Sequence, residues 1–185
     1  GPVRILAPMV TRRDEMAHLG RLVQSCTREL RREGHHLPQQ VQLGAMIEVP
    51  AAAIALPAML STLDFVSIGT NDLIQYLLAV DRGNPALGEM FSPLYPAVIR
   101  VLHQVIQTCK AAGKPVSICG EIASDARFTR MLLALGLTEF SMHPSSLLDI
   151  RATIRDSDLR QLRRRTGALL RAGRRTTLEQ LVARL

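Results

Sequence analysis

Short apolar runs alternate along the chain with longer segments in which apolar residues recur every three or four positions. Five of these runs are apolar on both faces, as buried strands of a parallel sheet are, and they cover residues 3–9, 43–49, 64–69, 116–119 and 139–142. Strands that alternate with helices in this way predict an α/β fold with right-handed crossovers. The first strand begins almost at the first residue, which suggests a piece of a longer chain.

Helical periodicity separates the expected strands. The first helix is expected to begin at a capping box formed by Thr11 and Asp14 and to end before Gly34. Its single apolar stripe consists of Met16, Leu19, Val23, Cys26 and Leu30. Further helices are expected over residues 51–60, 72–79, 96–112 and 125–135. In the helix expected at 96–112, one face consists of Val98, Leu102, Val105, Ile106 and Cys109.

The positive charge of the chain lies in its last segment. The 185 residues include 23 basic and 16 acidic ones, a net charge of +7, and residues 151–185 hold 10 arginines against Asp156, Asp158 and Glu179. Helices are expected here over residues 145–155 and 159–170, followed by one capped by Thr176 with Glu179. We expect their arginines to form a solvated face. Their leucines need a surface to pack on, and these are Leu159, Leu162, Leu169, Leu178 and Leu181.

Composition argues against nucleic-acid and membrane partners. The basic segment contains no aromatic residue on which a base could stack, so we do not expect it to bind nucleic acid. No run approaches the roughly 18 apolar residues of a membrane span, and no signal peptide is recognisable. The 3 cysteines cannot all pair, and none has zinc-ligand spacing, so we expect a cytoplasmic protein.

Polar side chains stand at the carboxyl ends of the expected strands, where sites gather in parallel α/β sheets. Glu48 follows the second strand in apolar surroundings, and Asn71 and Asp72 follow the third. A buried carboxylate needs a partner or a cation, and two oxygen ligands with room for water and phosphate suit Mg²⁺. The alternatives are a buried salt bridge for Glu48 and capping of its own helix for Asp72.

An arginine and a cysteine supply the remaining candidate chemistry. Arg82 can bind a phosphate or carboxylate through two parallel hydrogen bonds, although a surface pair with Asp81 is the competing interpretation. Cys119 ends the fourth strand before a glycine, and as a thiol at neutral pH it would be a proton donor. Cys26 and Cys109 are expected in the core, and the 5 histidines are expected to be structural or solvated.

Five segments in order resemble the phosphoenolpyruvate-binding domain of enzyme I, the phosphoenolpyruvate–protein phosphotransferase of the bacterial sugar phosphotransferase system. They are GAMIEVPAA at 44–52, DFVSIGTNDL at 64–73, LAVDRGN at 78–84, CGE at 119–121 and EFSM at 139–142. The likeness runs from residue 4 to about residue 155. Pyruvate phosphate dikinase and phosphoenolpyruvate synthase share the Asn-Asp and Cys-Gly elements and are the alternative relatives.

The resemblance implies a role for each candidate residue. Glu48 and Asp72 would bind Mg²⁺, and Asn71 and Arg82 would contact the substrate phosphate. Cys119 would protonate the enolate carbon of pyruvate once the phosphoryl group has left. The implied fold is a TIM-type (β/α)₈ barrel. Residues 1–155 would form its C-terminal part, about five βα units, and residues 156–185 would form basic helices packed on it.

The resemblance also implies what the chain works with. Its ligands would be phosphoenolpyruvate and pyruvate, and its protein partners a histidine-bearing N-terminal domain, a phosphocarrier protein and a second copy in a homodimer. Three barrel strands and the histidine would lie upstream, so we expect no phosphotransfer by this chain alone. A non-catalytic dimerisation or binding module is the alternative. His143 and Pro144 depart from the family pattern.

Overall fold

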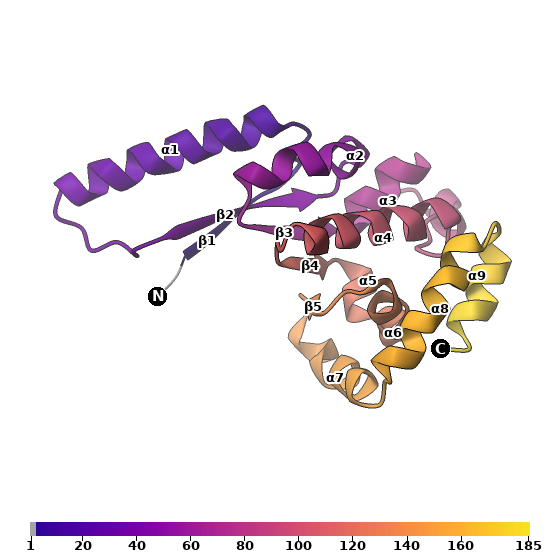
Figure 1. Ribbon diagram of the computed structural model, residues 1–185. Coiled ribbons are helices and arrows are strands. Elements are labelled where there is room, and N and C mark those ends of the chain that lie inside the picture. The colour runs from indigo at the N-terminus through magenta and orange to yellow at the C-terminus, as the bar shows by residue number, and fades with distance from the viewer. Residues whose placement is uncertain (1–2) are drawn as a thin grey trace.

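The computed structural model describes residues 3–185 and contains one parallel sheet whose strand order follows the chain (Figure 1). Its strands are β1 (Val3–Ala7), β2 (Val41–Ile47), β3 (Phe65–Gly69), β4 (Val116–Cys119) and β5 (Glu139–Phe140), and each pairs in parallel with the next. A doubly wound sheet reverses its order at a switch point, whereas consecutive barrel units do not. The fold is therefore a partial (β/α) barrel, which confirms the predicted fold class.

Helices connect the strands as the periodicity predicts. The connecting helices are α1 (Arg13–Arg32), α2 (Pro50–Met59), α3 (Thr70–Leu78), α4 (Pro96–Ala111), α5 (Glu121–Ser124) and α6 (Ala126–Leu135). Three 3₁₀ turns lie at Leu60–Thr62, Pro85–Met90 and Pro144–Ser146. Helix α5 was not predicted, because its four residues are too few to establish a periodicity.

The core lies between the sheet and the helices that follow β3 and β4. The stripe predicted for α4 is confirmed, since its apolar members have no exposed surface, and these are Val98, Leu102, Val105, Ile106 and Cys109. Met131, Leu132 and Leu135 of α6 are buried against the same cluster. The sheet is therefore well covered where β3 and β4 end.

Helix α1 covers the edge of the sheet and is much less buried. Of its predicted stripe only Met16 is fully buried, while Leu30 is 37% exposed and Cys26 is also exposed. The prediction that Cys26 belongs to the core was wrong. In Figure 1, α1 and α2 lie on the same side of β1 and β2, and the second half of α1 extends away from every other helix. Strand β1 is an edge strand, and its Val3 is 43% exposed, so it is not buried on both faces as predicted.

Two predicted helix caps were wrong. The Glu15 carboxylate, not Asp14, accepts the backbone N–H groups of Thr11 (2.7 Å) and Arg12 (3.0 Å) at the start of α1. Arg12 is the N-cap residue, so Glu15 stands at the third helical position, from which a carboxylate reaches back to free N–H groups. Thr176 lies inside the last helix.

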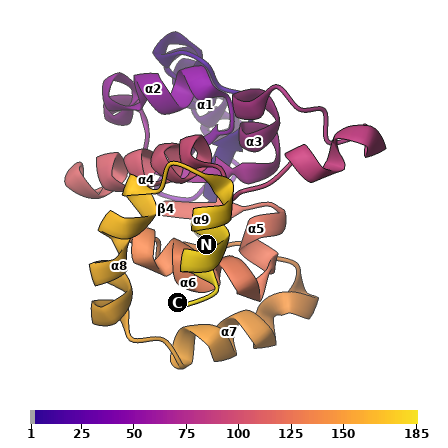
Figure 2. The ribbon, with the colours of Figure 1, turned by 90° about the vertical axis from the view of Figure 1, so that its right-hand side faces the viewer.

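Three helices follow β5: α7 (Leu147–Arg155), α8 (Leu159–Arg171) and α9 (Arg175–Val182). Helix α8 lies beside α6 and contacts α4, as Figure 2 shows, and the Thr166 hydroxyl donates to the Ala134 carbonyl at 2.6 Å. Leu162, Leu169 and Leu178 are buried, whereas Leu159, also expected to pack, is 40% exposed at the start of α8. Within residues 3–185, no helix has the length and apolarity needed to cross a membrane.

Candidate functional site

Glu48 stands just beyond β2 and is 4% exposed. Its Oε1 accepts the backbone N–H of Met9 at 2.7 Å, from the segment that follows β1. A Cβ added at Gly69 would lie 2.6 Å from Glu48 Oε2, so the glycine at the end of β3 makes room for this carboxylate. No ion pair to Glu48 is found among the described residues, so the alternative of a buried salt bridge was wrong.

Asp72 lies in the first turn of α3 and belongs to the same group of charges. Gly69 is the N-cap of α3, so Asp72 does not cap its own helix. Its Oδ1 lies 3.4 Å from Arg82 Nη2. Asp81, the alternative partner of Arg82, instead accepts the backbone N–H of Gly83 at 2.8 Å.

The pKa of Glu48 responds to both Asp72 and Arg82. Burial raises the pKa of Glu48, and the negative charge and hydrogen-bonding capacity of Asp72 raise it further. The Met9 N–H and the positive charge of Arg82 act in the opposite direction. Two carboxyl groups are thus close enough to compete for a proton, an arrangement that a bound cation would stabilise.

Cys119 ends β4 and is half-buried. Its thiol donates to the Ile68 carbonyl at 3.5 Å and accepts from the Ser67 hydroxyl at 3.7 Å. Burial raises its pKa, the Ser67 hydrogen bond opposes that shift, and the charges of Glu48 and Asp72 reinforce it. The sulfur therefore stays protonated at neutral pH within the field of the two carboxylates.

Asn71 is held against the turn that follows Cys119. Its Oδ1 accepts the backbone N–H of Glu121 at 3.1 Å, which leaves the amide NH₂ group for a ligand. Gly120 has φ +95°, and a Cβ there would lie 2.8 Å from Asn71 Oδ1 and in close contact with Thr70 Oγ1. The Cys-Gly sequence thus lets β4 end close against the start of α3.

A cavity of about 440 Å³ opens over Cys119. Asn71, Gly120, Glu121 and His143 line it with the cysteine, and Asn71 and Glu121 also border a larger neighbouring cavity. Glu48, Asp72 and Arg82 do not line it and lie beside it as a charged group. The structure thus brings the five predicted residues to the carboxyl ends of β2, β3 and β4, two of them facing the cavity.

His143 also lines this cavity, a position that the sequence did not predict. Its Nδ1 accepts the backbone N–H of Ser145 at 3.3 Å, so in the neutral ring the proton is on Nε2. His143 is exposed, in agreement with its expected solvated state. Its position just after the last strand was the available signal, because the carboxyl ends of all the strands share one edge.

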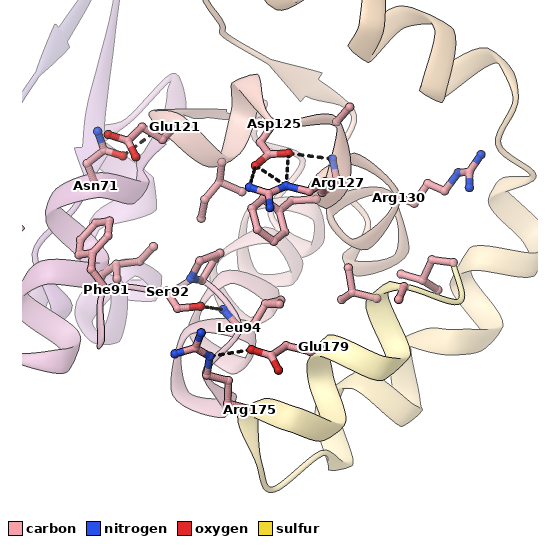
Figure 3. Close-up of a pocket in the computed structure, with 18 of the residues that line it drawn as sticks. Asn71, Phe91, Ser92, Leu94, Glu121, Asp125, Arg127, Arg130, Arg175 and Glu179 are labelled. Carbon is pink, nitrogen blue, oxygen red and sulfur yellow. Dashed lines mark hydrogen bonds and ion pairs between the residues drawn. The ribbon is translucent and has the colours of Figure 1, made fainter. Parts of the chain in front are cut away.

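The neighbouring cavity, of about 800 Å³, lies between the Pro85–Met90 turn, α6 and α9 (Figure 3). Two of its arginines are held in ion pairs: Arg127 bonds Asp125 at 2.6 Å, and Arg175 bonds Glu179 at 2.7 Å. The smaller cavity instead contains the Cys119 thiol and lies next to the buried Glu48 carboxyl, so it is the better candidate for the site.

Mg²⁺ was predicted at Glu48 and Asp72, and their donor set fits it. Within residues 3–185 no cluster of three or more His, Cys, Asp or Glu side chains is placed to hold a metal ion. Mg²⁺, however, is commonly bound through one or two carboxylates and completes its shell with water and substrate phosphate. Two adjacent carboxyl groups, one of them buried without a cationic partner, match that requirement.

Comparison with known proteins places these residues in a family context. A family model described as the PEP-binding domain of PEP-utilising enzymes matches residues 1–159. A phosphoenolpyruvate-protein phosphotransferase of Cupriavidus necator is 46% identical over 154 residues, which are 83% of this chain and 26% of that protein. One of Haemophilus influenzae is 36% identical over 182 residues, 98% of this chain and 32% of that protein. The chain spans about a quarter to a third of the length of these curated relatives.

A likeness to a solved structure supports the fold. A structure described as a citrate lyase from Burkholderia xenovorans superposes with a TM-score of 0.62 at 18% identity. The match covers 98% of this chain and 63% of that one. At this identity the comparison concerns the arrangement of strands and helices alone.

Proposed function

The chain belongs to the PEP-utilising enzymes, as their PEP-binding domain, and we propose that it is the substrate-binding part of a phosphoenolpyruvate–protein phosphotransferase. The observation that carries the proposal is one group of side chains at the carboxyl ends of β2, β3 and β4. There the buried Glu48 carboxyl lies beside Asp72, Asp72 pairs with Arg82, and the Cys119 thiol lies within the field of both carboxylates.

Glu48 and Asp72 would hold Mg²⁺, which when bound offsets negative charge on the phosphoryl group. The raised pKa of Glu48 supports this assignment, because burial and a neighbouring carboxylate both oppose its ionisation without a cation. The Met9 N–H, 2.7 Å from Oε1, fixes the orientation of the carboxyl group.

Arg82 and Asn71 would bind the phosphate of phosphoenolpyruvate. The guanidinium presents several N–H donors in one plane, and its contact with Asp72 keeps it next to the carboxyl pair. The Asn71 oxygen is used by the Glu121 N–H, so its NH₂ group is the donor left for a phosphate oxygen. Both residues would bind and orient the group that is transferred.

Cys119 would supply the proton that completes pyruvate. The bond between phosphorus and the enol oxygen breaks as a bond forms to a histidine nitrogen of another domain, and an enolate remains. The Cys119 thiol then gives its proton to the terminal enolate carbon, which becomes the methyl group, and water reprotonates the thiolate. The raised pKa and the donation to the Ile68 carbonyl support this role, since both favour a protonated sulfur.

The partners are part of this proposal. The phosphoryl acceptor would be a histidine on an N-terminal domain, from which a phosphocarrier protein takes the group, and the parent protein would be a homodimer. Because the acceptor would be a histidine of another domain, we expect transfer to require that domain together with this five-stranded sheet. The exposed edge strand β1 would favour association of the isolated chain.

The test uses the Cupriavidus necator relative with its matching segment replaced by this chain. We expect the chimaera, and not the chain alone, to form phosphohistidine from phosphoenolpyruvate with Mg²⁺. Cys119→Ala should lower turnover by about 10²–10⁴-fold, the usual contribution of a general acid. It should also abolish exchange of the pyruvate methyl protons with deuterium oxide.

Cys26→Ala is the matched control, because Cys26 is exposed on α1, far from the site in sequence and fold. This variant should retain both turnover and exchange, which shows that the chimaera is folded and that a lost thiol alone has no effect. Full turnover by the Cys119→Ala chimaera would contradict the proposed role of the thiol as proton donor.

A further inference from the structure

A second cavity of about 380 Å³ lies where three helices meet, away from the carboxyl ends of the strands. The last turns of α4 and α6 and the middle of α8 form its walls, and Figure 2 shows α8 alongside α6 and next to α4. In a barrel the helices run antiparallel to the strands, so the ends of α4 and α6 lie at the opposite face from Cys119. This cavity is therefore separate from the substrate site.

The side chains that face this cavity are basic or neutral donors. Lys110 and Arg163 supply two positive charges, and His103, Gln107 and Thr166 complete the polar lining. No acidic residue lines the cavity, and none occurs anywhere in α4, α6 or α8. The positive charges are thus left without a counter-ion from the helices that carry them.

Two carbonyl groups that line this cavity are already used as acceptors. The free carbonyls at the end of α6 would be the natural partners of a cation, because a helix C-terminus carries partial negative charge. Yet the Thr166 hydroxyl donates to the Ala134 carbonyl at 2.6 Å, and the Gln107 amide donates to the Leu135 carbonyl at 3.0 Å.

Lys110 and Arg163 also act on each other. Lys110 and Arg163 are exposed, but partial desolvation and the positive charge of Arg163 lower the pKa of Lys110, so the two cations repel each other. Among the residues from 3 to 185, neither forms an ion pair within 4.0 Å. An anion between them would remove this repulsion.

We propose that the cavity between α4, α6 and α8 binds a phosphoryl dianion, supplied as free phosphate or as the phosphate of a small monoester. Lys110 would act as a point charge and Arg163 as a planar donor pair, a combination suited to tetrahedral oxyanions. Its volume is within the range of about 300–1,000 Å³ of small-molecule sites. Burial lowers the pKa of His103, so at neutral pH it adds one neutral N–H donor.

The test is a titration of the ¹⁵N-labelled 185-residue chain, followed by amide NMR shifts in a phosphate-free buffer. Inorganic phosphate and glycerol 3-phosphate are added in separate arms at a constant ionic strength of about 0.15 M, where exposed charges are screened beyond ~8 Å. Amides of Gly136 and Thr166 report on this cavity, and those of Asn71 and Gly120 report on the substrate site. Failure at one site is thereby distinguished from failure at the other.

We expect saturable shifts at Gly136 and Thr166, and a dissociation constant at least about tenfold weaker in Arg163→Gln and in Lys110→Gln. Arg164→Gln is the matched control, because the next arginine of α8 is likewise exposed and carries the same charge but does not line the cavity. It should bind as the unaltered chain does. A monoester that binds more tightly than phosphate identifies phosphorylated metabolites as the ligand source, and equal binding identifies free phosphate.

Two results would overturn the proposal. In the first, sodium chloride at equal ionic strength produces the same shifts as phosphate. In the second, Arg164→Gln weakens binding as much as Arg163→Gln, which would mean that the general charge of α8 is responsible. Dispersion of the amide spectrum in each variant shows that the fold is retained.

Discussion

The Arg82 guanidinium lies 3.4 Å from the Asp72 carboxylate and does not pair with Asp81, its neighbour in sequence. This contact places the proposed phosphate-binding arginine beside a candidate metal ligand. Arg82→Gln should weaken phosphoenolpyruvate binding about tenfold or more, since a hydrogen bond to a charged group contributes about 1.5–3 kcal/mol. Calorimetric titration of the chimaera with phosphoenolpyruvate measures this loss of affinity. Arg127→Gln is the control, because the Arg127 guanidinium is bonded to Asp125. Unchanged affinity in Arg82→Gln would remove the arginine from the site.

Glu48 should make the stability of the metal-free chain depend on pH. Its pKa is raised by folding, so its contribution is fully present below the ordinary pKa of glutamate and is lost as pH rises through the raised value. Glu48→Gln should therefore be more stable than the unaltered chain at neutral pH in EDTA, with little difference at low pH.

Urea unfolding between about pH 4 and pH 8 measures this difference. Mg²⁺ should then raise the unfolding midpoint of the unaltered chain and leave that of Glu48→Gln unchanged. A Glu48→Gln chain that is less stable at neutral pH would contradict the assignment of Glu48 as a buried, uncompensated carboxylate.

Gly120→Ala should destabilise the chain by about 2–4 kcal/mol. The backbone of Gly120, with φ +95° and ψ −173°, lies in a region that essentially only glycine adopts, which costs a residue with a side chain about 1–3 kcal/mol, and the new Cβ would also crowd Asn71 and Thr70. Gly113→Ala is the control, because Gly113 has φ +64° and nothing within 4 Å of an added Cβ. The control should lose only about 1–2 kcal/mol, the cost of a positive φ, and equal losses in the two variants would show that the backbone and the close approach at Gly120 add no further cost.

The three cysteines should react with iodoacetamide in a fixed order. Cys26 is exposed and should react first, and Cys119 should follow slowly because burial raises its pKa. Burial raises the pKa of Cys109 to about 12, so it should react only after unfolding. Peptide mass spectrometry at pH 8 measures the order. Labelling of Cys119 before Cys26 would mean an activated thiolate, which is unsuited to a proton donor.

Glu15→Gln should destabilise the chain by about 1 kcal/mol at neutral pH, the usual cost of losing a helix cap. The bonds from Thr11 and Arg12 lower the pKa of Glu15, so its contribution is present above the ordinary glutamate pKa and is lost as pH falls through the lowered value. Asp14→Asn, one residue earlier, should cost only a few tenths of a kcal/mol through the helix dipole. Thermal unfolding at pH 7 and pH 3 compares the two variants. A larger loss of stability in Asp14→Asn than in Glu15→Gln would mean that Asp14 caps the helix, as the sequence predicted.

Sequence periodicity correctly predicted the helices in which one whole apolar face is buried. The stripe of α4 was predicted correctly because β4 and the helices α2, α3, α6 and α8 all pack on α4, so that each apolar position meets a partner. The same reasoning misplaced Cys26, because a periodic pattern shows which residues share a face and not whether another element covers that face. The cap of α1 was missed by one residue for a related reason, since side-chain reach depends on where the helical backbone begins.

The candidate site was predictable as a set of residues and not as a set of contacts. The strand ends indicated Glu48, Asp72 and Cys119, because parallel strands bring their carboxyl ends to one edge. The hydrogen bond from Met9 to Glu48 joins groups 39 residues apart and depends on the left-handed backbone of Met9, which no local pattern predicts. The position of His143 likewise depends on how the chain leaves a strand of only two residues.

The Met9–Glu48 hydrogen bond connects the rim of the sheet to the proposed chemistry. Strand β1 is paired on one side only and its first residues are exposed, so it can open locally, and an opening that includes Met9 would release the carboxyl group of Glu48. The orientation of Glu48 for the proposed metal is in this way coupled to the docking of the first strand. The exchange rate of a single amide proton, that of Met9, would report how often this hydrogen bond is broken.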